Sequence, residues 1–228
     1  IDLMYKEIQR KKLANEIKII KVPNLYPVGY ERYLVNTIFD KDYHEHPNEI
    51  GVLIHNVSTI YSIYEALEEG KPLIERIITL CGEGIKNNIN VKVKIGTNLK
   101  ELINKINEIN RNVDKMYLIS SGPMTGESFR SLDIIISPTT LATIFLPLNN
   151  KYKTEACLGC GRCNKYCPVS LTPTEISYYL FKKDKEELTK LKVDNCVSCG
   201  ICSYVCPSRI DLTYNMKRAK QLLLKGEK

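Results

Sequence analysis

The residues best suited to chemistry are eight cysteines near the carboxyl end, which form two copies of one spacing, C-x2-C-x2-C-x3-C-P. Cys157 opens the first copy and Cys196 the second, so the two copies are an internal repeat offset by 39 residues. Three thiolates at this spacing wrap around one iron–sulfur cubane, while the fourth points to the neighbouring cluster. The repeat therefore predicts two 4Fe–4S clusters with exchanged fourth ligands: Cys157, Cys160, Cys163 and Cys206 for one, and Cys196, Cys199, Cys202 and Cys167 for the other.

Disulfides and zinc are the two other uses of closely spaced cysteines. Disulfides are typical of small secreted domains, and the first residues do not form a secretion signal. Zinc sites favour paired C-x2-C knuckles over triplets followed by Cys-Pro, so the spacing favours iron–sulfur clusters. The ninth cysteine, Cys81, sits in an apolar run and is expected to be a packing residue.

Helices are expected around the two cysteine groups. Thr172 is predicted to be an N-cap, with Pro173 at the first helical position and Glu175 completing a capping box. Further helices are expected over residues 185–191 and 210–224. The clusters are therefore predicted to lie in a helical two-cluster ferredoxin module.

The first part of the chain alternates between helical and strand patterns, which is typical of an open α/β sheet. Such sheets bind ligands beyond the carboxyl ends of their strands. The pattern therefore predicts a partial open α/β sheet domain with a ligand site at two loops. The expected helices span residues 4–14, 30–39 and 57–69, and the expected strands span residues 16–22 and 51–55.

Those two loops supply the candidate binding residues. The first carries Tyr26 and Gly29 and leads to Glu31. The second places Asn56 and Thr59 at a helix N-terminus, where backbone amides favour a phosphate. A plain N-cap role for Asn56 is an equally good interpretation.

The next part of the chain predicts a small β-grasp domain, with several short strands around one helix at 98–109. The turn over residues 121–126 is predicted to be structural. The expected fold class is thus α/β plus α+β. The predicted domains are residues 1–70 for the partial open α/β sheet, 71–150 for the β-grasp and 151–228 for the two-cluster module.

The composition and charge exclude several classes of protein. The 228 residues carry a net charge of +7, with 43% hydrophobic and 26% charged residues, as in an ordinary globular protein. No run of residues is apolar enough for a transmembrane helix. The basic residues are dispersed without a recognition motif, so no nucleic-acid partner is expected. The basic stretch 209–228 is either a solvated helix face or a docking face for an acidic partner or membrane surface.

In the order of its motifs the chain resembles the C subunit of the Rnf electron-transport complex (RnfC) over nearly its whole length. Because the chain does not begin with Met and is helical in pattern almost from its start, it is interpreted as an N-terminally incomplete member. Besides the cysteine motifs, the matching stretches are residues 25–31, 55–59, 70–76, 95–97 and 122–124.

This resemblance implies a flavin- and NADH-binding domain like that of respiratory complex I, a β-grasp of the soluble-ligand-binding type, and a two-cluster module. It implies FMN and NADH as cofactors of the intact protein, other subunits of a membrane complex as partners, and a cytoplasmic location at the inner face of the membrane. The flavin-site positions would be Tyr26, Gly29, Glu31, Asn56 and Thr59.

The chain also departs from the family pattern. Tyr30 replaces a second glycine, Ser121 and Thr125 replace a Gly and a Met, and the glycine-rich and acidic flavin loops are absent. The implied function is an electron-transfer component of an ion-translocating ferredoxin:NAD oxidoreductase, inactive as an isolated fragment and with no catalytic side chain assigned. The alternatives are a soluble RnfC-like donor to a partner reductase, or a non-enzymatic two-cluster electron carrier.

Overall fold

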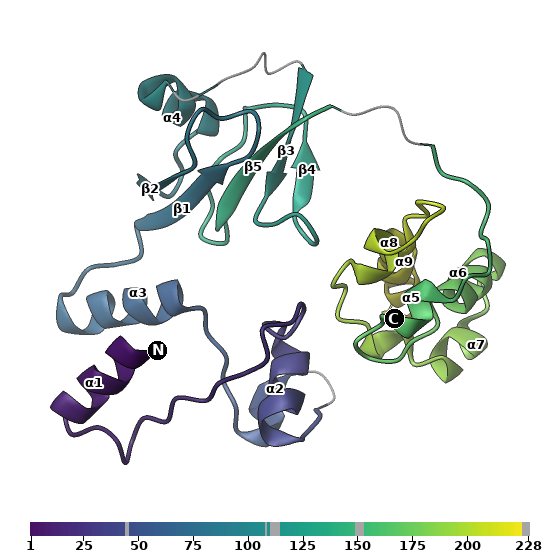
Figure 1. The fold of residues 1–228 in the computed structure, drawn as a ribbon, viewed down its shortest axis with the longest axis horizontal. Coiled ribbons are helices and arrows are strands. Elements are labelled where there is room, and N and C mark those ends of the chain that lie inside the picture. Colours follow the sequence, from purple (N-terminus) through teal and green to yellow (C-terminus); the bar gives the residue numbers. More distant parts are fainter. Residues whose placement is uncertain (44–45, 108, 110–114, 149–152, 225–228) are drawn as a thin grey trace. The chain divides into compact units, whose positions relative to one another are not determined.

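A computed structural model describes residues 1–43, 46–107, 109, 115–148 and 153–224 (Figure 1). The chain divides into two compact units, Ile1–Ile54 and His55–Lys228. None of the helices in the described ranges is long and apolar enough to span a bilayer.

The first unit is built from short helices. Helix α1 (Asp2–Arg10) buries none of its residues, whereas α2 (Glu31–Phe39) buries Val35 almost completely. A short 3-10 helix, η1 (Pro47–Ile50), follows near the end of the unit. The two helices predicted here are confirmed, although α1 begins and ends earlier than expected.

The two strands expected in this part of the chain do not form. Residues 17–23 and residues 52–56 have no regular secondary structure, and Ile17 and Leu53 are 46% and 76% exposed. A strand is stable only where neighbouring strands pair with its backbone, and no described segment pairs with these two. The open α/β sheet predicted for residues 1–70 is therefore not present in the described part of the chain.

The second unit contains one five-stranded sheet with the strand order β2-β1-β5-β3-β4. Strands β1 and β5 run parallel, and the other neighbouring pairs are antiparallel. Side chains alternate along β1, so Ile78 and Leu80 are fully buried while Ile77 is 58% exposed. The strands span Glu75–Cys81 (β1), Ile89–Lys94 (β2), Met116–Ser120 (β3), Glu127–Phe129 (β4) and Ala142–Pro147 (β5).

Helix α4 (Leu99–Ile106) completes the core of this sheet. Its residues Leu99 and Ile103 are buried in one cluster with the inward side chains of the strands. Asn98 caps the helix, because its side-chain oxygen accepts a 2.9 Å hydrogen bond from the Lys100 backbone N–H. A local cap and an apolar stripe thus explain why this segment is helical between strands.

The cysteine-rich part of the second unit, described over residues 153–224, is helical, and no strand forms within it. Its two longest helices, α6 and α9, pack against each other, and α7 contacts both. Their apolar faces meet in a second core that includes Ile176, Leu188 and Met216. The elements are α5 (Arg162–Lys165), α6 (Pro173–Lys182), α7 (Lys185–Lys190), η3 (Val193–Asn195), α8 (Ile201–Tyr204) and α9 (Leu212–Leu224).

The start of α6 differs in one detail from the prediction. Thr172 is the N-cap and Pro173 the first helical residue, as expected, but the Thr172 side chain makes no cap hydrogen bond. A side chain reaches the first amides of a helix from extended backbone, and Thr172 has a ψ of only 78°. The predicted capping box with Glu175 is therefore wrong.

Candidate metal centres

The eight motif cysteines surround two cavities in the helical part of the second unit. The first cavity holds about 530 Å³ of space and the second about 340 Å³, open solvent included. Each is lined by the first three cysteines of one motif and the fourth cysteine of the other, which is the partition that the spacing predicts. The first cavity contains Cys157, Cys160, Cys163 and Cys206, and the second contains Cys196, Cys199, Cys202 and Cys167.

The repeat folds both motifs in the same way. Gly161 and Gly200, with φ of +68° and +85°, are the N-caps of the one-turn helices α5 and α8. Glycine adopts a left-handed φ at little cost, so the chain turns sharply between the second and third cysteines. The fourth cysteine of each motif follows its short helix. Because α5 and α8 contact each other, each fourth cysteine reaches the cavity of the other motif.

Backbone amides donate hydrogen bonds to several of the eight sulfurs. Such N–H···S bonds favour the charged thiolate over the neutral thiol, and bonds of this kind are among the factors that set cluster potentials. The donors are placed by the sharp turns of the ligand loops. Among them are Gly159 N, 3.4 Å from Cys157 Sγ, Ser198 N, 3.4 Å from Cys196 Sγ, and Leu171 N, 3.3 Å from Cys167 Sγ.

Two threonines beside the cavities were missed by the sequence analysis. Thr213 Oγ1 lies 3.6 Å from Cys202 Sγ. Burial raises the pKa of the Cys163 thiol, and a side-chain hydrogen bond with Thr174 opposes that rise. Thr174 and Thr213 are themselves 39 residues apart. Extending the repeat beyond its Cys-Pro ends would have found them.

Burial governs the protonation of the innermost cysteines. It raises the pKa of the Cys196 and Cys199 thiols and brings the pKa of the Cys202 thiol to about 11. These side chains are therefore neutral thiols at pH 7 unless a cation compensates the charge. A metal that binds here must displace their protons, which couples its affinity to pH.

The cavities do not have the geometry of a site for one metal ion. In the described residues, no three Cys, His, Asp or Glu side chains come close enough together to hold such an ion. All nine cysteines are free thiols. The motif cysteines instead line each cavity four at a time, and thiols are the donors that iron–sulfur clusters take. Cys81 lies in β1 and lines neither cavity.

Three of the candidate flavin residues lie in the first unit. The Tyr26 and Tyr30 rings pack edge to face, with centroids 5.8 Å apart, and their hydroxyls are 3.1 Å apart. Gly29 has no neighbouring atom within 4 Å of where a Cβ would lie, so space alone does not require glycine there. Glu31 begins α2, and its carboxylate accepts a 3.5 Å hydrogen bond from the Tyr43 hydroxyl.

Asn56 and Thr59 lie in the second unit, at the start of helix α3 (Val57–Glu68). The Asn56 side chain accepts a 2.9 Å hydrogen bond from the Ser58 backbone N–H, so it is an N-cap. The Thr59 amide donates to the Asn56 carbonyl. This is the plain capping role that the sequence left open for Asn56. The flavin role of all five positions stays a prediction.

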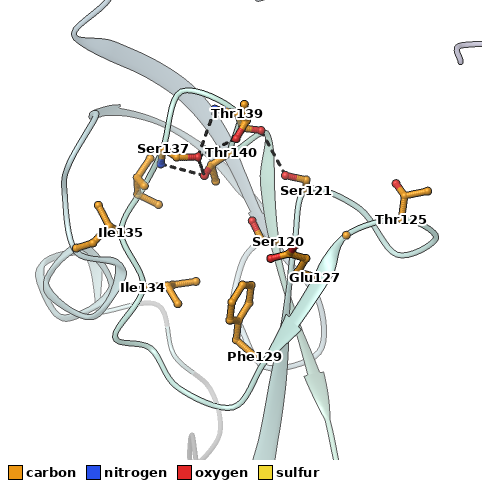
Figure 2. A pocket seen from close by; sticks show the side chains of 12 residues that line it. Ser120, Ser121, Thr125, Glu127, Phe129, Ile134, Ile135, Ser137, Thr139 and Thr140 are labelled. Carbon is orange, nitrogen blue, oxygen red and sulfur yellow. Dashed lines mark hydrogen bonds between the residues drawn. The ribbon is translucent and has the colours of Figure 1, made fainter. Parts of the chain in front are cut away.

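A third cavity, of about 790 Å³ with open solvent included, lies beside β3 and β4 (Figure 2). Hydroxyl side chains dominate its lining, and several of them bond to one another: Ser137 Oγ lies 2.9 Å from Thr139 Oγ1 and 3.1 Å from Thr140 Oγ1. Ser121 donates to the Thr139 carbonyl at 3.4 Å. These contacts hold neighbouring loops together, in line with the structural role predicted for the 121–126 turn.

Two family models match separate parts of the chain. The model described as a 4Fe–4S dicluster domain matches residues 156–210, and the Nuo51 FMN-binding domain matches residues 1–65. The match over residues 1–65 agrees with the flavin-binding domain predicted for the first part of the chain. The two strands predicted there do not form.

Curated relatives match most of the chain. The C subunit of the proton-translocating ferredoxin:NAD(+) oxidoreductase complex of Clostridium ljungdahlii is 35% identical over 197 residues, which cover 82% of this chain and 43% of that protein. The C subunit of the ion-translocating oxidoreductase complex is 31% identical in Buchnera aphidicola, over 81% of this chain and 37% of that protein. It is 33% identical in Rhodobacter capsulatus, over 79% of this chain and 35% of that protein. The chain thus spans less than half the length of these relatives.

Proposed function

Because this chain belongs to the family of C subunits of ion-translocating oxidoreductase complexes, we propose that it is the electron-transfer portion of such a protein. When bound, a flavin would exchange a hydride with NADH, and two 4Fe–4S clusters would carry electrons singly between it and a partner. The complete complex would be an ion-translocating ferredoxin:NAD oxidoreductase. The observation that carries the proposal is the division of the eight cysteines between two cavities, four to each.

The role of this chain's own residues is to hold and insulate the clusters. The eight cysteines would supply all of the protein ligands, and the nearby amides would donate to their sulfurs. Cys163 and Cys199, each 7% exposed, place part of each ligand set away from water. A low-dielectric surround makes nearby charges and hydrogen bonds count more in setting the potential.

The remaining parts of the chain are assigned by the same proposal. Residues 1–70 would contribute Tyr26, Gly29, Glu31, Asn56 and Thr59 to an FMN and NADH site completed by further polypeptide. Residues 71–150 would be a β-grasp of the soluble-ligand-binding type, in line with the five-stranded sheet and the helix α4. The boundary proposed at 150/151 lies outside the described residues.

Partners and location follow from the family. Other subunits of a membrane complex would accept or supply the electrons, with the chain peripheral to the inner face of the cell membrane. Fractionation of the native protein tests this placement. Recovery with the membrane fraction supports it, whereas recovery together with a soluble reductase favours the alternative of a soluble electron donor.

Anaerobic reconstitution of the chain, followed by iron and acid-labile sulfide assay, tests the cluster proposal. We expect about eight irons and about eight sulfides per chain, because each cavity would hold a four-iron cubane. A plateau near four irons, or zinc in place of iron, would contradict it. The C81A variant is the matched control, since Cys81 lines neither cavity and its loss should leave the iron content unchanged.

A further inference from the structure

We propose that Lys220 is an electrostatic positioning residue that raises the reduction potential of the cluster held by Cys196, Cys199, Cys202 and Cys167. Its ammonium Nζ donates a 3.0 Å hydrogen bond to the Cys196 backbone carbonyl. The inference rests on the proposed function, because it requires a cluster in the second cavity.

The structure places this ammonium where its charge reaches the ligands. Lys220 lies on α9, which contacts η3, and Cys196 directly follows η3. The Lys220 side chain is half-buried, so water screens it less than the exposed Lys217 and Arg218 of the same helix.

A fixed positive charge near a cluster favours its reduced state. One-electron reduction adds a negative charge to the cubane, and the attraction between that charge and an ammonium lowers the free energy of the reduced form. Ion pairing with a carboxylate would cancel the effect. Among the described residues no salt bridge of Lys220 is found, so its charge stays available to the cluster.

The internal repeat has no second lysine at the position equivalent to Lys220. The offset of 39 residues that relates the two motifs places Phe181 of α6 at the position of Lys220 of α9. Phe181 is 69% exposed and uncharged. The two halves of the repeat therefore differ at this position, with a lysine in one and an uncharged residue in the other. This difference would allow the two cluster potentials to be set separately.

Substitutions at Lys220 separate charge from hydrogen bonding. In the full reconstituted chain, K220Q loses the charge and retains a shorter amide donor, and K220R keeps both a charge and a donor. K217Q removes the same charge from the exposed face of α9 and serves as the control for net charge. Redox titration monitored by EPR gives the midpoint potential of each cluster, and the signal of the second cluster is the one that survives in the C157A/C206A variant.

We expect K220Q to weaken reduction of the second cluster at least about threefold, which is a shift of about 28 mV at 59 mV per tenfold change. The first cluster, K220R and K217Q should keep the original potentials. An unchanged potential in K220Q, or an equal shift in K217Q, would overturn the inference. So would loss of iron from K220Q alone, which would show that the lysine only holds the ligand loop. An unsubstituted chain without clusters would instead overturn the proposed function.

Discussion

The exchange of fourth ligands can be tested by counting iron in double variants. Cys206 belongs to the second motif in sequence, yet it lines the first cavity with Cys157, Cys160 and Cys163. The C206A variant therefore removes one of four ligands from the first cavity and none from the second. Iron should fall from about eight to about four per chain if each cubane needs all of its cysteines.

Pairs of substitutions then distinguish crossed from uncrossed ligation. If ligands are exchanged, Cys157 and Cys206 serve one cluster, so C157A/C206A should lose no more iron than either single variant and retain about four irons. Cys196 and Cys206 serve different clusters, so C196A/C206A should retain almost none. Uncrossed ligation gives the reverse pattern.

The assay is iron and sulfide content after anaerobic reconstitution, with circular dichroism to show that each variant keeps its helices. The mirror pair, C167A with C196A or C157A, repeats the test on the second cavity. The reasoning is refuted if C157A/C206A loses all of its iron while C196A/C206A keeps about half. That outcome would mean that the contact between α5 and α8 does not direct the fourth cysteines across the repeat.

Three further predictions concern stability, pH and flavin. L188A should destabilise the iron-free chain by about 2–5 kcal/mol in urea unfolding, because Leu188 is fully buried, whereas F181A, at a 69% exposed position, should change it by less than about 0.5 kcal/mol. The pKa of the Cys202 thiol is about 11 in the folded chain and 9.0 in a free thiol. Between these two pH values the folded iron-free chain therefore binds more protons than the unfolded chain. Its stability should fall as pH rises from about 9 to about 11, by up to about 3 kcal/mol, and C202S should flatten this slope in unfolding at fixed pH values. Titration of FMN into the chain, followed by fluorescence, should show weak binding or none, and tight stoichiometric binding would contradict our interpretation of Tyr30 and of the missing loops.

Much of the candidate site was predictable from the sequence because the relevant information is local. Each motif defines one ligand loop by the intervals between its cysteines, the glycine before its third cysteine and the proline after its fourth. A loop of this kind needs few contacts with distant parts of the chain. The helix predicted over residues 98–109 is likewise a property of a short segment, and the structure shows it as α4, Leu99–Ile106, with Asn98 as its N-cap.

Sequence reasoning failed where a local pattern needed a distant partner. The apolar residues around Ile17 and Leu53 fit a strand, but no described segment supplies the pairing that a strand requires, and both side chains are largely exposed. Thr172 has the right type for a capping box, yet its side chain makes no cap hydrogen bond in the folded chain.

Spacing determined which cysteines form the two sets, while tertiary structure decided what surrounds them. Thr213 reaches Cys202 and Lys220 reaches Cys196 only because α9 packs against the ligand loops, 11 and 24 residues away in sequence. The 39-residue repeat identifies Thr174 and Thr213 as equivalent positions. It does not predict that Lys220 donates to the backbone carbonyl of Cys196. The physical reason is that ligand identity depends on residue type and interval, whereas the electrostatic environment depends on which helix faces pack together.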